Sequence, residues 1–486
     1  MNVLLYVLDA LRADHLSCYG YERETTPIID RLANEGVRFD RCYAPATWTR
    51  PVAASLLTGL YPPAHGTRTR YDTLGTAHQT LATQLHDAGY DTVGVTSMGN
   101  VSTATGFNRG FDRFYDLYLD ESLLDRRASS TATEEELKTE TGAVALPRAE
   151  DITATLKEWL TGRESEAPFF AFCWSIETHI PYDPPPDSMR FRDPDYDGPV
   201  DGSRESLMQV RTPADLNQLQ ALYDEEIRYN DDCIGDVLAL LESRDELDET
   251  LVVVVGDHGD AFCEHGRLTH GHAPHEEVVR VPWVLRPPAG DSSTGFVDSQ
   301  VSLVDVAPTL IELATGRTTS ESVGGNEEVG GTSLAGAMSG ETVTGKEAVF
   351  FETRSYDMQN GYYGVRTPEW KYVEIDRPDL SISTLVGLVR YIVEKGILTD
   401  VLRNPRYYVR RYRHDEKTQL YRLATDPDER ENVADSYTDQ RAALATVLSE
   451  WRHRCERFRS ALPDEDTQAD VDEKTREQLH QLGYVE

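Results

Sequence analysis

Continuous apolar runs alternate with helical patterns along the first two thirds of the chain. Residues 3–8 are apolar throughout and end at Asp9, a pattern typical of a strand buried on both faces of a parallel sheet. The other strands expected from apolar runs are 37–43, 92–96, 169–174 and 251–255. The helices expected between the strands are 27–32, 81–88 and 216–241. This alternation predicts a doubly wound α/β sheet.

A second block follows residues 316–345, a segment rich in Gly, Ser, Thr and Glu that we interpret as a flexible surface connection. The strands expected in this block are 348–352, 362–366 and 371–374. A helix is expected after them, running through Leu448 and Trp451. We therefore predict a large domain at 1–340 and a smaller C-terminal α+β subdomain at 346–486.

Polar residues that end apolar strands are the first candidates for chemistry, because open α/β sheets bind ligands beyond the carboxyl ends of their strands. Asp9, Asp257 and His258 hold such positions. Aspartate and histidine side by side supply the oxygen and nitrogen ligands of a divalent cation. Adjacent residues on a strand point to opposite faces, so both can bind one ion only if the chain bends, and Gly259 makes a bend feasible. The alternative interpretation is an ordinary polar turn.

Thr49 lies at an abrupt helix start, since Pro51 two residues later suits a first helical turn. The free N–H groups and the dipole at such a helix end favour anions, and they help a hydroxyl to lose its proton. The alternative interpretation is that Thr49 is an ordinary N-cap residue.

Histidines gather in the loops that the predicted crevice would contain. These histidines are His65, His179, His265, His270, His272 and His275. Imidazoles can bind a metal, protonate a leaving oxygen or contact a bound oxyanion. We expect about half of them to have supporting or structural roles.

The composition changes this picture mainly through charge. The 486 residues include 84 acidic and 48 basic side chains, for a net charge of −36, and only 7 of the basic residues are Lys. Such a field argues against nucleic acid as a partner. It is typical of halophilic-type proteins that stay hydrated in high salt, and the alternative is an acidic surface that binds a cationic partner.

The cysteines and the first residues of the chain are the features from which we predict the cellular location of the protein. The 6 cysteines show no metal-ligand spacing, and we expect mostly reduced, partly buried thiols. Residues 2–9 lack a basic leader and a cleavage site, and their apolar run is too short to span a bilayer. A cytoplasmic location is therefore expected.

Ordered motifs extend along nearly the whole chain. They are Asp9-Ala10-Leu11-Arg12-Ala13-Asp14-His15, Thr26-Pro27, Ser55-Leu56-Leu57-Thr58-Gly59-Leu60-Tyr61-Pro62, His65-Gly66, Asp257-His258-Gly259, Glu264-His265-Gly266, Arg280-Val281-Pro282, Asp305-Val306-Ala307-Pro308 and Leu420-Tyr421-Arg422-Leu423. This set resembles the sulfatases of the alkaline phosphatase superfamily, least at 115–165 and 378–415. The resemblance implies an alkaline-phosphatase-like α/β fold.

The resemblance also implies roles for individual residues. The implied ligands of one divalent metal ion (Ca²⁺, Mn²⁺ or Mg²⁺, with Zn²⁺ also compatible) are Asp9, Thr49, Asp257 and His258. The implied catalytic residues are the Thr49 nucleophile, His179 and His272, and the implied substrate contacts are Arg50, His65 and His270.

Three departures from the family pattern narrow the expected mechanism. Formylglycine sulfatases carry Cys or Ser in a Cys-x-Pro-Ser-Arg pattern, whereas Thr49 opens the corresponding segment here. Threonine cannot give the aldehyde, because its β-carbon already bears a methyl group. Ala10 replaces a second Asp, and Gly271 stands where a Lys often precedes His272. We therefore expect a metal-activated Thr49 hydroxyl that forms a covalent ester, while His179 or His272 protonates the leaving oxygen.

Three functions remain compatible with this site. The first is hydrolysis of a sulfuric ester, of a small molecule or a glycan. The second is phosphodiesterase activity or phosphoglycerol- or phosphoethanolamine-type transfer at the same Thr49. The third is a non-catalytic, metal-stabilised binding protein.

Residues 384–413 combine helical apolar spacing with a cluster of Arg residues, which is unusual in so acidic a chain. They could contact an anionic membrane surface peripherally or bind a polyanionic substrate. The alternative is an ordinary subdomain helix whose Arg side chains pair with the acidic surface.

Overall fold

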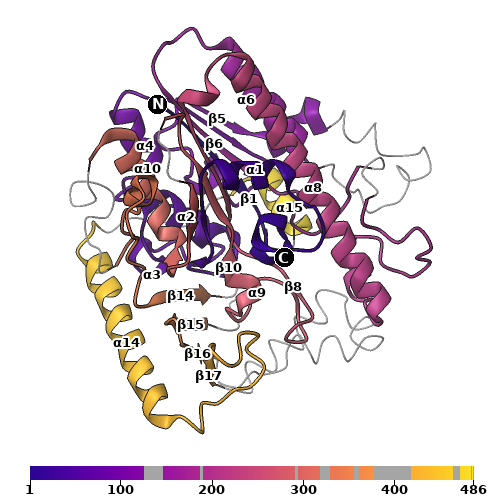
Figure 1. Ribbon diagram of the computed structural model, residues 1–486, viewed down its shortest axis with the longest axis vertical. Coiled ribbons are helices and arrows are strands. Elements are labelled where there is room, and N and C mark those ends of the chain that lie inside the picture. Colours follow the sequence, from indigo (N-terminus) through magenta and orange to yellow (C-terminus); the bar gives the residue numbers. More distant parts are fainter. Residues whose placement is uncertain are drawn as a thin grey trace.

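An eight-stranded mixed sheet forms the centre of the molecule in the computed structural model (Figure 1). The structure describes residues 1–124, 146–185, 190–290, 294–317, 329–354, 361–376, 417–463, 471–482 and 484. The strands, in spatial order, are β12 (Gly295–Val297), β2 (Val37–Phe39), β11 (Trp283–Arg286), β7 (Thr250–Gly256), β1 (Asn2–Leu8), β6 (Phe169–Ser175), β4 (Asp91–Thr96) and β5 (Arg113–Asp116). Only β11 runs antiparallel to its neighbours in this sheet.

The central strand β1 has the continuous apolar sequence because both of its faces are covered. Val3, Leu5 and Val7 face one hydrophobic core, while Leu4 and Tyr6 face the other. All five side chains are at most 1% exposed. The predicted doubly wound α/β architecture is confirmed.

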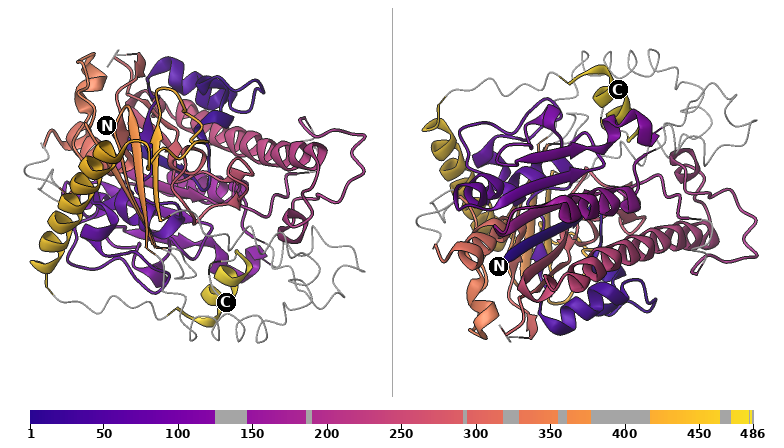
Figure 2. Two further views of the ribbon diagram at one scale, coloured as in Figure 1. Left: turned by 90° about the horizontal axis from the view of Figure 1, so that it is seen from below. Right: turned by 90° about the horizontal axis from the view of Figure 1, so that it is seen from above.

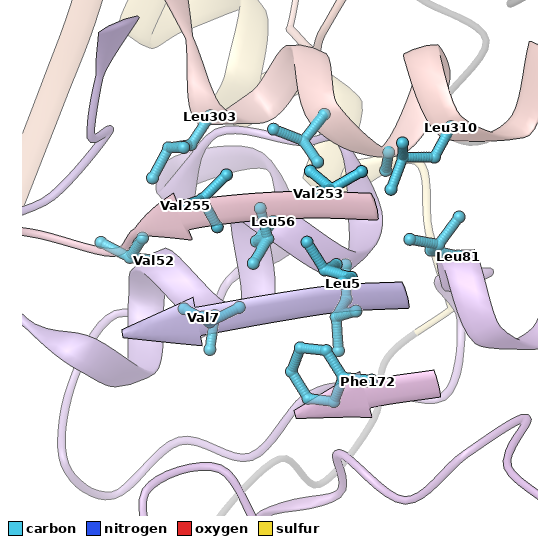
Figure 3. Close-up of a cluster of buried hydrophobic side chains, with 14 of the residues drawn as sticks. Leu5, Val7, Val52, Leu56, Leu81, Phe172, Val253, Val255, Leu303 and Leu310 are labelled. Atoms are coloured by element: carbon cyan, nitrogen blue, oxygen red, sulfur yellow. The ribbon is translucent and has the colours of Figure 1, made fainter. Parts of the chain in front are cut away.

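Helices cover both faces of this sheet (Figure 1). The helices on the Leu5 face are α2 (Thr49–Thr58), α4 (Leu81–Asp87) and α10 (Val306–Thr315). The helices on the opposite face are α1 (Pro27–Glu35), α6 (Ala149–Gly162) and α8 (Pro213–Ser243). Figure 3 shows how Leu56 of α2, Leu81 of α4 and Leu310 of α10 meet Leu5 and Val253 in the first core.

Shorter elements connect these layers. They are the strands β3 (Cys42–Tyr43), β8 (Ala261–Phe262), β9 (Leu268–Thr269), β10 (Arg280–Val281) and β13 (Val301–Ser302), and the helices α3 (Pro62–His65), α7 (Arg204–Leu207), α9 (Glu276–Val279), η4 (Leu117–Leu119), η8 (Leu303–Asp305) and η10 (Ala335–Ser339).

The expected strand 37–43 is divided in two. Val37–Phe39 pairs with β11 in the large sheet, whereas Cys42–Tyr43 pairs with β10 and β13 in a three-stranded sheet. The chain turns at Asp40 and Arg41 between them. An apolar run alone does not show this change of partner, because Val37, Phe39, Cys42 and Tyr43 are all buried whichever sheet they join.

The second block contains a separate four-stranded antiparallel sheet. Its strands are β14 (Val349–Arg354), β15 (Gly361–Arg366), β16 (Trp370–Asp376) and β17 (Thr418–Arg422). The helix α14 (Thr438–Ser460) lies along this sheet, as Figure 2 shows. Trp451 of α14 stacks on Phe350 with ring centroids 4.6 Å apart, and it meets Tyr61 edge-on at 5.4 Å. The division at 340 and 346 stays a prediction.

The structure describes part of the predicted connection at 316–345 and none of the Arg-rich segment at 384–413. The segment 316–345 is not simply a surface connection, since Leu334 and Met338 pack in the first core and Gly330 bridges Leu60. Residues 318–328 of this segment lie outside the described residues, as does the whole Arg-rich segment 384–413. Among the helices that the structure describes, none is long and apolar enough to cross a membrane.

We predict that Trp451→Ala lowers the free energy of unfolding of the second block by about 3–5 kcal/mol, because a large buried side chain leaves a cavity. Urea denaturation followed by tryptophan fluorescence and circular dichroism measures this change. Val447→Ala on the same helix is the control, since Val447 is 37% exposed and its loss should cost about 0.5 kcal/mol or less. Equal losses in the two variants would contradict this packing.

Candidate functional site

Asp9 lies directly after β1 and is fully buried. Its backbone N–H donates to the carbonyl of Ser175 at 2.9 Å, which continues the pairing between β1 and β6. Its Oδ2 accepts hydrogen bonds from Trp174 Nε1 at 3.0 Å and from Thr49 Oγ1 at 3.2 Å. Its Oδ1 has no hydrogen-bond partner among the described residues. One oxygen of the carboxylate is therefore held in place while the other stays available.

Asp257 and His258 follow β7, the strand beside β1, so the two strand ends bring them to Asp9. Asp257 Oδ1 accepts from the N–H of Ala10 at 2.8 Å and of His258 at 2.6 Å. Ala10 adopts a left-handed conformation with φ of 58°, which turns its N–H toward this carboxylate. Asp257 Oδ2 has no partner in the described part of the chain. The expected bend after Asp257 is present.

Thr49 is the first residue of α2, and Trp48 rather than Thr49 holds the N-cap position. The Thr49 hydroxyl lies 3.2 Å from Asp9 Oδ2 and 3.3 Å from His258 Nε2. It therefore faces the carboxylates at the strand ends instead of capping its own helix. The ordinary N-cap interpretation is wrong.

The three polar side chains fit a divalent cation. One ligand atom from each of Asp9, Asp257 and His258 lies within 4.8 Å of the others. His258 Nε2 is 3.3 Å from Asp257 Oδ2 and 3.8 Å from Asp9 Oδ1, the two carboxylate oxygens without partners. Buried polar atoms without partners are costly, and a cation would satisfy both at once.

Burial away from water shifts the pKa values of Asp9, Asp257 and His258. Burial raises the pKa of Asp9 to about 7. Burial and the charge of Asp9 raise the pKa of Asp257 well above its usual value. Burial and the nearby His270 lower the pKa of His258 well below its usual value, so its neutral imidazole is suited to binding a metal. A divalent cation favours the ionised carboxylates and the neutral ring.

Two further histidines border Thr49. His179 Nδ1 contacts the carbonyl oxygen of Ile180 at 2.6 Å, and its Nε2 lies 3.0 Å from the hydroxyl of Tyr484. His270 Nδ1 contacts Asp260 Oδ1 at 2.6 Å, and its ring centroid lies 4.3 Å from that of His258. The carboxylate of Asp260 orients His270 so that Nε2 faces the same point as Nε2 of His179.

The phenol of Tyr484 occupies this point. Its oxygen lies 2.9 Å from Thr49 Oγ1, 3.0 Å from His179 Nε2 and 3.2 Å from His270 Nε2. Tyr484 is 1% exposed and comes after α15 (Glu473–Gln481), far along the sequence from the other residues.

Arg50 is a buried guanidinium beside the candidate nucleophile. Its described acceptors are all neutral, namely the carbonyl oxygens of Arg70 at 2.5 Å and Asp72 at 3.1 Å and the side-chain oxygen of Asn100 at 2.9 Å. Burial lowers the pKa of Arg50 to about 10, so the guanidinium remains a cation at neutral pH. A buried positive charge therefore lies on the helix turn that begins with Thr49.

The structure does not bring the other two predicted histidines to Thr49. His65 is held within its own region, since Ser55 Oγ lies 3.0 Å from Nε2 and the Thr67 N–H donates to Nδ1 at 3.1 Å. His272 Nε2 contacts the carbonyl oxygen of Thr269 at 2.8 Å, and its Nδ1 has no partner among the described residues. Among the described residues, the hydrogen-bond partners of the Thr49 hydroxyl are Asp9, His258 and Tyr484, and neither of these two rings is one of them. Their roles in the predicted mechanism stay predictions.

Sequence reasoning did not assign Trp174, Asp260 or Tyr484 to the site. Asp260 had a usable signal, because a carboxylate follows Asp257 and His258 within one turn. Trp174 also had one, since it ends an expected strand with an N–H that needs a partner when buried. Tyr484 had none, because its position depends on where α15 packs.

Comparison with known proteins bears on the family and the fold of this chain. A sequence model of the sulfatase family matches residues 1–316. The N-acetylglucosamine-6-O-sulfatase of Bacteroides thetaiotaomicron is 24% identical over 89% of this chain and 88% of its own length. Human arylsulfatase A is 25% identical over 76% of this chain and 74% of its own.

Solved structures give the same fold. A phosphonate monoester hydrolase from Silicibacter pomeroyi superposes with a TM-score of 0.68 at 19% identity, over 97% of this chain and 100% of its own. A protein solved with its substrate D-glucosamine-2-N,6-O-disulfate superposes with a TM-score of 0.67 at 19% identity, over 94% of this chain and 98% of its own. These likenesses confirm the expected alkaline-phosphatase-like fold, and the family match shows that the chain belongs to the sulfatases, a family of ester hydrolases.

Proposed function

We propose that this chain hydrolyses a sulfuric ester by attack of the Thr49 hydroxyl on sulfur. The observation that supports this most is the position of Thr49 Oγ1, within 3.3 Å of both Asp9 Oδ2 and His258 Nε2. The hydroxyl lies at the N-terminus of a helix, next to a pair of carboxylates of which one oxygen each, Asp9 Oδ1 and Asp257 Oδ2, has no partner among the described residues. The helix terminus favours an anionic substrate, and a cation held by the carboxylates would offset their charge and favour the ionised hydroxyl.

Asp9, Asp257 and His258 would hold the divalent metal, with Thr49 adjacent to it. A cation bound there withdraws electron density from the ester oxygens and lowers the pKa of a neighbouring hydroxyl. Asp9 Oδ2 accepts the hydrogen bond of Thr49 and so orients Oγ1. Arg50, whose described acceptors are neutral, supplies charge for the anionic oxygens.

The reaction then has two steps. As the Oγ1–S bond forms and the bond between sulfur and the leaving oxygen breaks, the proton of the Thr49 hydroxyl passes to a histidine and from there to the leaving oxygen. Sequence reasoning assigns this histidine as His179 or His272. The geometry favours His179, because its Nδ1 contacts the carbonyl oxygen of Ile180, which leaves Nε2 of the neutral ring to take up the proton and pass it on. Water then attacks sulfur, breaks the Oγ1–S bond and releases sulfate, which restores the hydroxyl.

Phosphoric or phosphonic esters are the second candidate substrates. The observation that favours them is the identity of residue 49, because a threonine cannot become an aldehyde and its covalent ester must be broken at sulfur or phosphorus. The names of similar proteins also support them, since these proteins include a multifunctional alkaline phosphatase superfamily protein of Trinickia caryophylli and two phosphonate monoester hydrolases. The names of the sulfatase relatives support a glycan ester as the natural substrate class.

We predict that Thr49→Val lowers kcat/KM by about a thousandfold or more, because the isosteric side chain keeps the packing and loses the nucleophile. Thr49→Ser should stay within about tenfold of the wild type, since its hydroxyl survives. Both variants are assayed on 4-nitrophenyl sulfate and bis(4-nitrophenyl) phosphate with defined divalent metals, which also decides between the two ester classes.

Thr58→Val is the matched control for these variants. Thr58 lies in the same helix and is equally buried, but its hydroxyl donates to the carbonyl oxygen of Ala54 at 2.6 Å. Activity in this variant should resemble that of the wild type. If Thr49→Val kept its activity on both esters, Thr49 would not be the nucleophile.

We also predict that Ca²⁺, Mn²⁺ or Mg²⁺ stabilises the chelator-treated protein. At a metal concentration a thousand times Kd, binding to the native state contributes about 4 kcal/mol, which raises the Tm. Asp257→Asn should abolish the shift, because it removes one charged ligand. Differential scanning calorimetry with and without metal measures it.

The control for the metal experiment is Asp231→Asn. Asp231 is also fully buried, but its carboxylate accepts from the N–H groups of Ile28 and Ile29 at the start of α1. This variant should keep the metal-dependent rise in Tm. An undiminished rise in Asp257→Asn would argue against the proposed ligand set.

A further inference from the structure

The C-terminal segment, by which we mean Asp472 to Leu482 and Tyr484, docks on η4 and on the residues that follow β4. Both views of Figure 2 show its helix, in yellow, against a purple part of the large domain. The side chain of Gln478 is satisfied at both ends, since its Nε2 donates to the carbonyl of Ser97 at 2.8 Å and its Oε1 accepts from the Gly99 N–H at 2.5 Å. Thr475 Oγ1 lies 3.0 Å from the Tyr118 hydroxyl. The segment is therefore bound specifically.

Docking places the ring of Tyr484 inside the pocket. Its ring centroid lies 6.1 Å from that of Trp48, which precedes the nucleophile, and 5.5 Å from that of His179. Its hydroxyl contacts Thr49, His179 and His270 together, at 2.9, 3.0 and 3.2 Å. These are the groups that an ester and its leaving oxygen must reach.

Tyr484 and an ester cannot occupy this place together. A reacting sulfur or phosphorus atom has to approach within about 3–3.5 Å of the attacking oxygen. The phenol oxygen already stands 2.9 Å from Thr49 Oγ1, and Thr49 itself is 0% exposed. The docked segment thus closes the site.

We propose that Tyr484 is an internal ligand of the substrate pocket, and that the C-terminal segment regulates the enzyme by undocking before an ester reaches Thr49. The proposal rests on the proposed function in one respect, the role of Thr49 as the nucleophile. An aromatic alcohol hydrogen-bonded at this place resembles the alcohol product of an aryl ester.

One face of the segment is exposed and the other is buried. The residues of α15 at positions 473, 474, 476, 477 and 480 are exposed, whereas the buried contacts are made by Thr475, Gln478, Leu479, Leu482 and Tyr484. None of these residues belongs to a strand of the large sheet, so the segment can leave while the hydrogen-bonded sheet stays intact. Local opening of this kind requires far less than global unfolding.

An internal ligand has a defined kinetic signature. Only the open fraction binds substrate, so the apparent affinity falls by that fraction, whereas the chemistry in the bound complex is unchanged. Weakening the docked state should therefore lower KM and leave kcat nearly constant. A catalytic tyrosine would give the opposite result, a lower kcat after its removal.

Tyr484→Ala and Gln478→Ala test this in the full-length, metal-loaded protein with 4-nitrophenyl sulfate. We expect kcat/KM to rise about tenfold or more in both variants, through KM, with kcat within about twofold of the wild type. Glu477→Ala is the matched control, because Glu477 is an exposed neighbour on the same helix, and its KM should not change. A drop in kcat at constant KM in Tyr484→Ala would overturn the proposal and make Tyr484 a catalytic residue.

Binding of orthovanadate, measured by isothermal titration calorimetry, gives a readout that needs no turnover. Its Kd should fall about tenfold in Tyr484→Ala and Gln478→Ala and stay constant in Glu477→Ala. Unchanged vanadate binding and unchanged KM in the first two variants would overturn the proposal. Tighter vanadate binding without hydrolysis of either ester by any of the proteins would support the internal ligand and remove the proposed function instead.

Discussion

The site depends on two carboxylates that the sheet forces together away from water. Asp9 and Asp257 follow the adjacent parallel strands β1 and β7, and both side chains are 0% exposed. Two unit charges no more than 4.8 Å apart repel each other by roughly 3.5 kcal/mol or more at an effective dielectric constant of about 20. The two carboxylates cannot move apart, because the register of β1 and β7 fixes both positions in the folded state. A cation or a proton must compensate the repulsion, and this need organises Thr49 and His258 around the same point.

Much of the fold was predictable because apolar runs and strand ends are local features of the sequence. The run at 3–8 identified β1, and the position of Asp9 after it identified a side chain of the site. Asp257 and His258 were found by the same reasoning, since parallel strands end at one edge of a sheet. The division of 37–43 into β2 and β3 could not be found in this way, because strand partners are set by tertiary contacts.

The roles of the histidines show where local reasoning stops. His65 carries the same imidazole as His179, but the structure gives both of its ring nitrogens neighbours within its own region. In His179, Nδ1 contacts the carbonyl of its own loop, whereas Nε2 contacts the Tyr484 hydroxyl, which in turn contacts Thr49. Tyr484 is a more extreme case, since its contact with Thr49 joins residues 435 positions apart. No spacing or composition signals such a contact.

Ala10 sets the charge balance of the site. Its side chain supplies no carboxylate where the family pattern has a second Asp, and its left-handed backbone directs a neutral N–H to Asp257 instead. The two remaining carboxylates and a divalent cation sum to zero formal charge, with His258 neutral. An anionic ester would therefore meet no net charge from these two carboxylates and the cation together. In a protein with a net charge of −36, this local neutralisation would allow an anion to approach Thr49.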